Sequence, residues 1–199
     1  MPISVAAGTD AGGSRDVRSL AAPLRALVTL VLKRLGRRTG EIAIVVADDA
    51  LTRRLNREWR RMDHATDVIT FAYDEHEADA DTRPINGDLV VSLDRVRVQA
   101  KRWRVSEAAE LARLVIHGAL HLCGHDHMKA AERRVMRAFE DAAMLEAGPV
   151  IAAMEKKWPK APQAPKAAKP PAKAKVRTPA KPARRARPGV AKSRRKARD

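Results

Sequence analysis

The sequence His117-Gly-Ala-Leu-His121-Leu-Cys-Gly124-His-Asp-His127 follows directly on a long apolar run that favours a helix. The four-residue spacing of His117 and His121 places both imidazoles on one helix face, one turn apart. Gly124 predicts the helix end, because glycine commonly takes the left-handed position after a last turn. The chain can then double back and bring His127 over the same point. Three protein ligands with an open fourth position are typical of a catalytic zinc site, so the segment predicts a zinc hydrolase.

Two histidines four residues apart also occur by chance in helices that bind no metal. A helical wheel at about 100° per residue argues against chance, because the histidines lie roughly opposite the apolar face. That face consists of Ala108, Leu111, Ala112, Val115, Ala119 and Leu122, whereas Glu110, Arg113 and Leu114 share the histidine stripe. We therefore expect His117, His121 and His127 to bind a metal ion. Cys123 is a possible fourth ligand, but its position off the stripe favours a small buried thiol.

The net charge of +16 over 199 residues is concentrated at the C-terminus. Residues 155–199 hold 17 Lys and Arg against two acidic residues, a net of +15, and eight of the twelve prolines. The other 154 residues hold 23 basic and 22 acidic groups. We expect a folded domain over 1–154 and a disordered tail over 155–199, because the tail has too few apolar side chains to form a core. Spaced cations on such a tail bind polyanions without reading sequence, and a purely solubilising tail is the alternative.

Hydrophobic periodicity predicts strands and helices in alternation. We expect strands near 2–6, 41–47, 67–73 and 88–93, with an acidic loop over 74–86. We expect helices over 16–35, 48–59, 92–103, from 106 through the histidines, and over 129–146. This order predicts a layered α+β or α/β domain.

The sequence also predicts the compartment. A single cysteine excludes an internal disulfide, the N-terminus lacks the plan of a signal peptide, and the apolar run Ala26–Leu32 is too short to cross a bilayer. We therefore expect a cytoplasmic protein with no membrane partner.

Gly118 stands where zinc peptidases carry a glutamate general base after the first histidine. Its presence counts against peptide hydrolysis. We expect Gly118 to leave open space beside the metal for a bulky substrate.

A second block, residues 55–71, reads Leu-Asn-Arg-Glu-Trp-Arg-Arg-Met-Asp-His-Ala-Thr-Asp-Val-Ile-Thr-Phe. Together with Gly87-Asp88 and the histidine segment, it resembles the YbeY family of bacterial endoribonucleases over roughly residues 41–147. The resemblance implies a small four-stranded mixed sheet packed with helices, with one zinc ion held by His117, His121 and His127. It further implies that Arg60 is the family's functionally important arginine. The implied activity is single-strand-specific RNA cleavage in maturation of the 16S rRNA 3′ end and in ribosome quality control.

This chain departs from the family pattern at several positions. His125 stands where the family usually has tyrosine, Thr70 where serine is usual and Ala72 where proline often occurs. His125 thereby adds a further imidazole to the loop. The basic tail lies outside the pattern.

The sequence leaves the chemistry of cleavage open. Either water or the ribose 2′-OH can attack phosphorus, and both routes build negative charge on phosphoryl oxygens, for which Arg60 offers a fork of donors. Asp126 is a candidate to hydrogen-bond a ligand imidazole or to cap the following helix. With only six aromatic residues, we expect RNA to be held mainly through its backbone. A zinc hydrolase with another substrate and a non-enzymatic ribosome-assembly factor remain alternatives.

Overall fold

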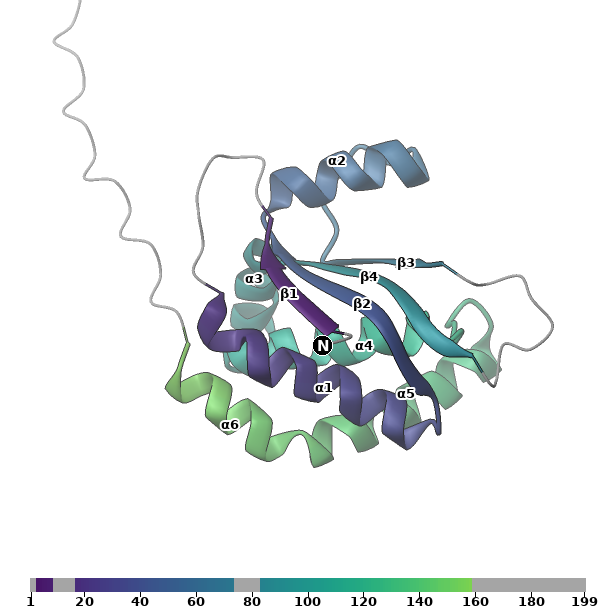
Figure 1. The fold of residues 1–199 in the computed structure, drawn as a ribbon. Helices are drawn as coiled ribbons and strands as arrows, with labels where there is room; N and C mark the ends of the chain where they lie inside the picture. Colours follow the sequence, from purple (N-terminus) through teal and green to yellow (C-terminus); the bar gives the residue numbers. More distant parts are fainter. Residues whose placement is uncertain (1–2, 9–16, 74–82, 159–199) are drawn as a thin grey trace, which may run out of the picture. The chain divides into compact units, whose positions relative to one another are not determined.

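Four strands form one mixed sheet in the computed structural model, which describes residues 3–8, 17–73 and 83–158. The strands β1 (Ile3–Ala7), β2 (Arg38–Ala47), β3 (Val68–Ala72) and β4 (Pro84–Ser92) lie in the order β1-β2-β4-β3 (Figure 1). The pairs β1–β2 and β2–β4 are parallel, whereas β3 runs antiparallel to β4. With the helices around it, this sheet confirms the predicted α+β fold.

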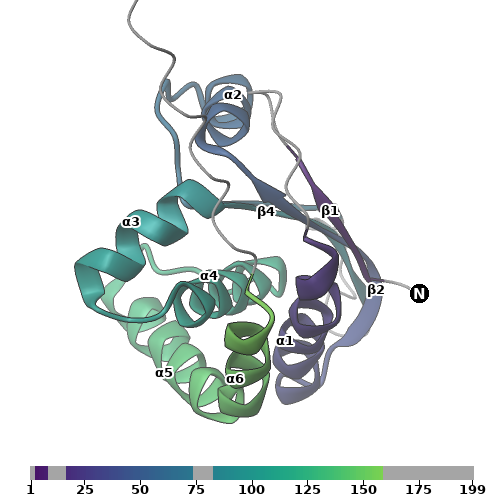
Figure 2. The same ribbon diagram turned by 90° about the vertical axis from the view of Figure 1, so that its left-hand side faces the viewer.

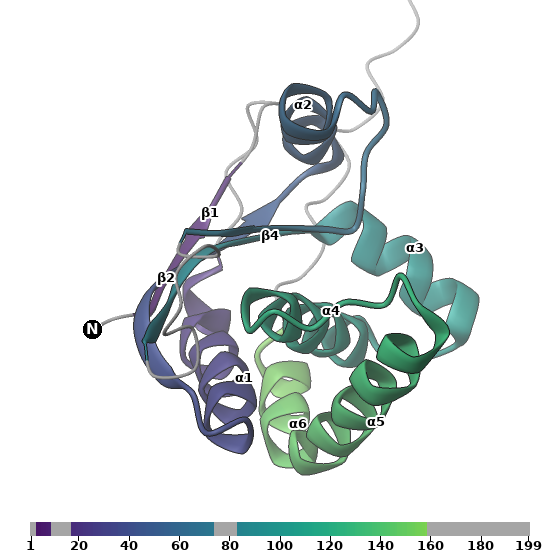
Figure 3. The same cartoon turned by 90° about the vertical axis from the view of Figure 1, so that its right-hand side faces the viewer.

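The helices lie on both faces of the sheet, but unequally. The helices α1 (Ala21–Arg34), α4 (Glu107–Leu122), α5 (Ala130–Glu146) and α6 (Gly148–Lys156) lie on one side, as does α3 (Leu93–Trp103) (Figures 2 and 3). A short 3-10 turn, Arg18–Leu20, precedes α1. Only α2 (Asp49–Arg60) covers the opposite face within the described part of the chain. None of these helices is long and apolar enough to cross a lipid bilayer.

Side-chain caps fix where three helices begin. Asp48 accepts the Leu51 N–H at 2.8 Å and starts α2. Ser92 accepts the Arg95 N–H at 3.2 Å and starts α3, and Ser106 does the same for α4 with the Ala109 N–H at 3.1 Å. Each cap satisfies a backbone donor that has no partner within its helix, which stabilises that helix start.

The core is centred on α4, which contacts α1, α3, α5, α6, β3 and β4. Eleven of its sixteen residues are buried, including Glu110 and Leu114 of the histidine stripe, outside the predicted apolar face. The helix is therefore enclosed on nearly all sides. A helix held this way is a rigid support for any side chain that it points into a cavity.

The strand and helix predictions are mostly confirmed, although β2 begins three residues earlier than predicted, at Arg38. The strand β4 begins at Pro84, so the end of the predicted loop 74–86 belongs to the sheet, where Arg38 pairs with Pro84. Proline is compatible with the first residue of a strand. The helix α6 was not predicted, although proline at its first turn is a start signal. Residues 74–82 of the predicted loop, and 159–199 of the predicted tail, lie outside the described residues.

Candidate metal centre

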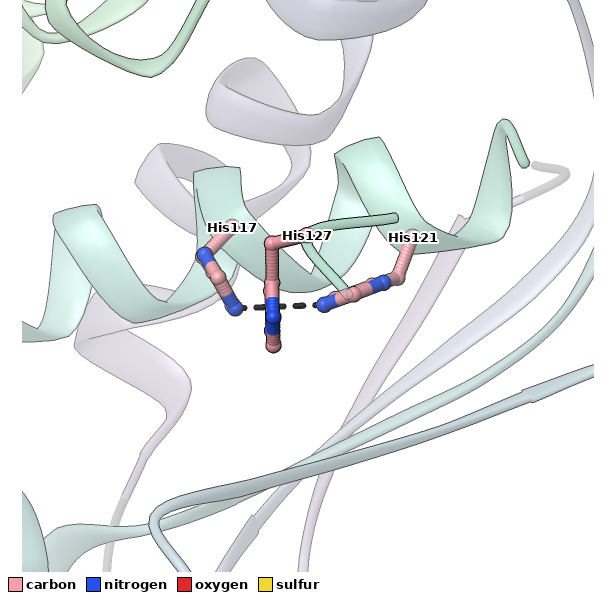
Figure 4. Close-up of side chains that lie close together, drawn as sticks. All are labelled: His117, His121 and His127. Carbon is pink, nitrogen blue, oxygen red and sulfur yellow. Dashed lines mark hydrogen bonds between the residues drawn. The ribbon is translucent and has the colours of Figure 1, made fainter. Parts of the chain in front are cut away.

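Three imidazoles converge at the end of α4. His117 and His121 are one turn apart on that helix, and their Nε2 atoms lie 3.2 Å apart, while His127 comes from the loop that follows (Figure 4). One ligand atom from each of the three lies within 4.8 Å of the others. Within the described residues, this is the group of side chains placed to hold a metal ion. The structure thus brings together the three histidines that the sequence analysis singled out.

The loop after α4 is fixed by backbone hydrogen bonds. Gly124 has φ +84°, a left-handed conformation that side chains other than glycine rarely adopt. Its N–H donates to the His121 carbonyl at 2.9 Å, and the His125 N–H donates to the Leu120 carbonyl at 3.1 Å. These bonds close the helix in the manner of a left-handed C-cap and turn the chain back toward α4.

Two further contacts hold the backbone at His127. The Asp126 carboxylate accepts the His127 N–H at 2.7 Å, and the Arg133 guanidinium donates to the His127 carbonyl at 3.2 Å. The helix α5 is capped by Lys129, so the predicted alternative of Asp126 as its cap is wrong. The acid acts instead on the backbone of the third histidine.

The environment of His121 suits metal binding. Burial, reinforced by the proximity of His117 and His127, lowers the pKa of His121 to about 4. A neutral imidazole keeps a lone pair on one ring nitrogen, which is the form that binds metals. Three imidazole nitrogens with no thiolate or carboxylate among them fit zinc or another borderline transition metal.

The histidines lie in a cavity of about 810 Å³ that also contains Arg60. Arg60 is exposed at the last position of α2, and the wall beside it includes Asp67 and Thr70, from the loop before β3 and from β3 itself. The structure thereby brings together the block 55–71 and the histidine segment, although 46 residues separate Phe71 from His117 in the sequence. Arg37 and Arg83 also line the cavity and were not predicted, because each is a single cation in an otherwise ordinary turn or strand start.

Asn56 explains how the loop between α2 and β3 is positioned. Its side chain is buried, and its Nδ2 donates to the His64 carbonyl at 2.9 Å. Arg53 holds the same loop through two 2.8 Å hydrogen bonds to Asp63. The loop leads directly to Asp67, so these contacts set the wall of the cavity.

Gly118 does not leave open space, and that prediction is wrong. The residue is buried, and a Cβ there would lie 2.7 Å from Leu89 Cδ1 and 3.2 Å from Val68 Cγ2. Gly118 therefore allows α4 to pack closely against β3 and β4. The absent side chain allows this close contact with the sheet.

Neither Cys123 nor His125 joins the metal-binding group. Cys123 is partly buried, and burial raises the pKa of its thiol to about 11, which disfavours the thiolate that metals bind. The His125 ring packs against Phe139 with centroids 5.1 Å apart. The prediction of a small buried thiol agrees with this environment.

A series of polar contacts behind His117, formed by Glu140 and Arg113, was not predicted. His117 Nδ1 lies 3.3 Å from Glu140 Oε2 on α5, and Glu140 Oε1 lies 3.4 Å from Arg113 Nη1. Burial alone would raise the pKa of Glu140, but the hydrogen bond with His117 and the charge of Arg113 outweigh it and hold the pKa below its ordinary value. Glu140 is 23 residues from His117, so no local motif connects them.

Known proteins match both the sequence and the fold. A family model described as Endoribonuclease YbeY matches residues 14–148. The chain belongs to the YbeY endoribonuclease family. An endoribonuclease YbeY from Anaeromyxobacter sp. (strain Fw109-5) is 40% identical over 156 residues, which cover 73% of this chain and 80% of the relative. One from Chloroflexus aggregans is 43% identical over 113 residues, covering 54% of this chain and 74% of the relative.

The solution structure of a Thermotoga maritima protein gives a TM-score of 0.52 at 23% identity, covering 73% of this chain and 88% of that one. This likeness concerns the fold. The family model spans all four predicted site residues, Arg60, His117, His121 and His127, so the resemblance stated from the motifs is confirmed at the level of the family.

Proposed function

We propose that this YbeY-family protein is a zinc-dependent endoribonuclease that cleaves single-stranded RNA. The observation that carries the proposal is the convergence of His117, His121 and His127 in one cavity with Arg60. A metal-ligand set and a cation on the same cavity suit the cleavage of a phosphodiester, because negative charge grows on the phosphoryl oxygens during the reaction.

The roles of the residues follow from their positions. When bound to the three imidazoles, zinc supplies a Lewis acid beside the phosphodiester. Arg60, exposed at the end of α2, can donate two N–H groups to non-bridging phosphoryl oxygens and orient the phosphate. His117, His121 and His127 act as neutral ligands, and none of them is proposed to move a proton.

Cleavage of defined RNA by the purified protein tests this proposal. Protein treated with a chelator and then reloaded with zinc should cut a single-stranded oligonucleotide and leave a matched duplex intact. End-group analysis then distinguishes the two routes, because attack by the ribose 2′-OH leaves a 2′,3′-cyclic phosphate and attack by water does not. Bound zinc without cleavage of any RNA would instead favour the non-enzymatic assembly factor.

We further propose that the substrate is the precursor of the 16S rRNA 3′ end, with a role in ribosome quality control, and that the protein acts in the cytoplasm. This extends the family resemblance to a substrate. Small-subunit particles carrying 3′-extended RNA are the direct test. Trimming of that extension by wild-type protein, and not by a His121→Ala variant, supports the assignment. Cleavage of generic single strands with no action on these particles would contradict it.

The basic tail is proposed to strengthen RNA binding without taking part in cleavage. The folded part extends past the predicted boundary at residue 154, since α6 ends at Lys156 and Trp158 Nε1 donates to Glu107 at 2.9 Å. A chain ending at residue 160 keeps these contacts and removes 14 Lys and Arg. It should still cleave RNA, with weaker binding and a shallower salt dependence, by about 0.7 in log–log slope per lost phosphate contact. Equal slopes for the two chains would show that the tail does not touch RNA.

A further inference from the structure

The two ring nitrogens of His117 face different partners. His117 Nδ1 faces the Glu140 carboxylate at 3.3 Å, whereas Nε2 faces His121 Nε2 at 3.2 Å. A neutral imidazole has one N–H, and an ionised carboxylate can only accept. In the neutral form of His117 the proton therefore belongs on Nδ1, which leaves the lone pair of Nε2 directed toward the other two histidines.

We propose that Glu140 is a positioning residue that holds His117 in the tautomer and ring orientation that bind the metal. The inference rests on the proposed metal site and assigns it a second layer of contacts. A carboxylate that accepts the free N–H of a ligand imidazole restricts rotation of the ring and raises the basicity of the ligand nitrogen. Glu140 acts on the metal through His117 and touches neither substrate nor metal.

Glu140 is itself held in place by a partly buried ion pair. Arg113 lies 3.4 Å from Glu140 Oε1 and grips Glu110 with two hydrogen bonds of 2.6 and 3.1 Å. Glu110 is only 2% exposed, so the Arg113 guanidinium is anchored on a buried carboxylate of its own helix, α4. Arg113 is thereby fixed on the helix that also carries His117. Because Arg113 pairs with Glu140, the α5 carboxylate is held opposite the ligand ring before any metal arrives.

The same series of hydrogen bonds reaches the wall of the cavity. Arg113 Nη2 donates to Gln99 Oε1 at 3.3 Å, and Gln99 Nε2 donates to Asp67 Oδ2 at 2.9 Å. Asp67 lines the cavity that contains Arg60 and the histidines. One series of hydrogen bonds therefore links Glu140, through Arg113 and Gln99, to Asp67 in the wall of the cavity.

A purely structural role makes a different prediction. If Glu140 served only to pair with Arg113, its loss would lower stability and leave the His117 tautomer unchanged. If the carboxylate acted only through its charge, a neighbouring acid would serve as well. Asp141 tests this point, since it is exposed, lies next to Glu140 and lines the same 320 Å³ pocket behind His117.

The full chain, free of metal and with 15N-labelled histidine, gives the first measurement. Wild type should show His117 protonated on Nδ1, and Glu140→Ala should lose this preference. Glu140→Gln keeps an acceptor oxygen and should restore it. Zinc affinity, measured against a competing chelator, should fall by about 10- to 100-fold in Glu140→Ala, recover most of this loss in Glu140→Gln, and stay at the wild-type value in Asp141→Asn.

Thermal unfolding of each variant controls for loss of structure. Should Glu140→Ala fail to fold, Glu140→Met removes the acceptor and keeps the packing volume. An unchanged tautomer and zinc affinity in the variant that lacks the acceptor would overturn the proposal, as would equal weakening by Asp141→Asn. The tautomer is read without metal or RNA, so a protein that binds zinc but cleaves nothing would contradict the proposed function and leave this inference standing.

Discussion

The helices α4 and α2 both contribute to the candidate site, yet they are built in opposite ways. Eleven residues of α4 are buried, and other elements surround it. Only three residues of α2 are buried, and it rests on a small separate cluster around Leu51 and Val90. The buried helix supplies two imidazoles held in fixed positions, and the exposed helix supplies one cation at its end. Metal binding and charge stabilisation should therefore respond to mutation independently.

Removing a ligand from the buried helix should have the largest effect. His121→Ala leaves two imidazoles, and tight metal binding should be lost together with RNA cleavage. Folding should be retained, because the His121 side chain is only partly buried. Metal analysis and circular dichroism of the same sample check this. A variant that keeps one tightly bound metal per chain would remove His121 from the ligand set.

Reversing the charge on the exposed helix should leave the metal in place. Arg60→Glu should lower the rate of RNA cleavage by about 10²- to 10³-fold, the effect of losing a donor to a developing oxyanion. Zinc content and melting temperature should stay close to wild type, since Arg60 is exposed.

Arg57→Glu is the matched control for this change. Arg57 lies one turn earlier on α2, makes a long 3.9 Å contact to Asp63 and does not line the cavity. Its variant should keep most of the cleavage rate. Equal losses for the two variants would mean that α2 acts through its total charge and that Arg60 has no special position.

The sequence predicted most of this arrangement because most of its signals are local. The i, i+4 histidines and Gly124 predict the helix end, and the block from Asn56 to Phe71 carries the family resemblance. The Glu140 contact was missed because it joins residues on different helices, and no periodicity links them. The role of Gly118 was assigned wrongly for a similar reason, since only the packed structure shows that Leu89 lies against it.

Enlarging Gly118 should therefore act on stability. Gly118→Val would press its side chain into Leu89 and Val68, and such overpacking lowers the free energy of unfolding by about 1–3 kcal/mol. Gly148→Ala is the control, because nothing lies within 4 Å of a Cβ there, and its effect should be close to zero. Urea denaturation of both variants measures the difference. A Gly118→Val protein as stable as wild type would contradict close packing of α4 on the sheet.

The reactivity of Cys123, directly after α4, should depend on pH. Burial raises the pKa of Cys123 from 9.0 to about 11, so the folded protein disfavours the thiolate. Alkylation at pH 8 should be about a hundredfold slower than in the unfolded chain, given two units of pKa. The rate should rise until about pH 11, and the contribution of this thiol to stability should be lost as pH rises above 9. Equal alkylation rates in the folded and unfolded chains at pH 8 would show that Cys123 is accessible.

Metal content and RNA cleavage, measured together on wild type, His127→Ala and His125→Ala, test the central claim most directly. We propose that His117, His121 and His127 bind one ion and that cleavage depends on it, while His125 packs against Phe139. This ligand set predicts about one zinc per chain and full cleavage for wild type and His125→Ala, and loss of both for His127→Ala. An empty site in His125→Ala with a full one in His127→Ala would contradict the ligand set, and cleavage by metal-free protein would contradict the mechanism.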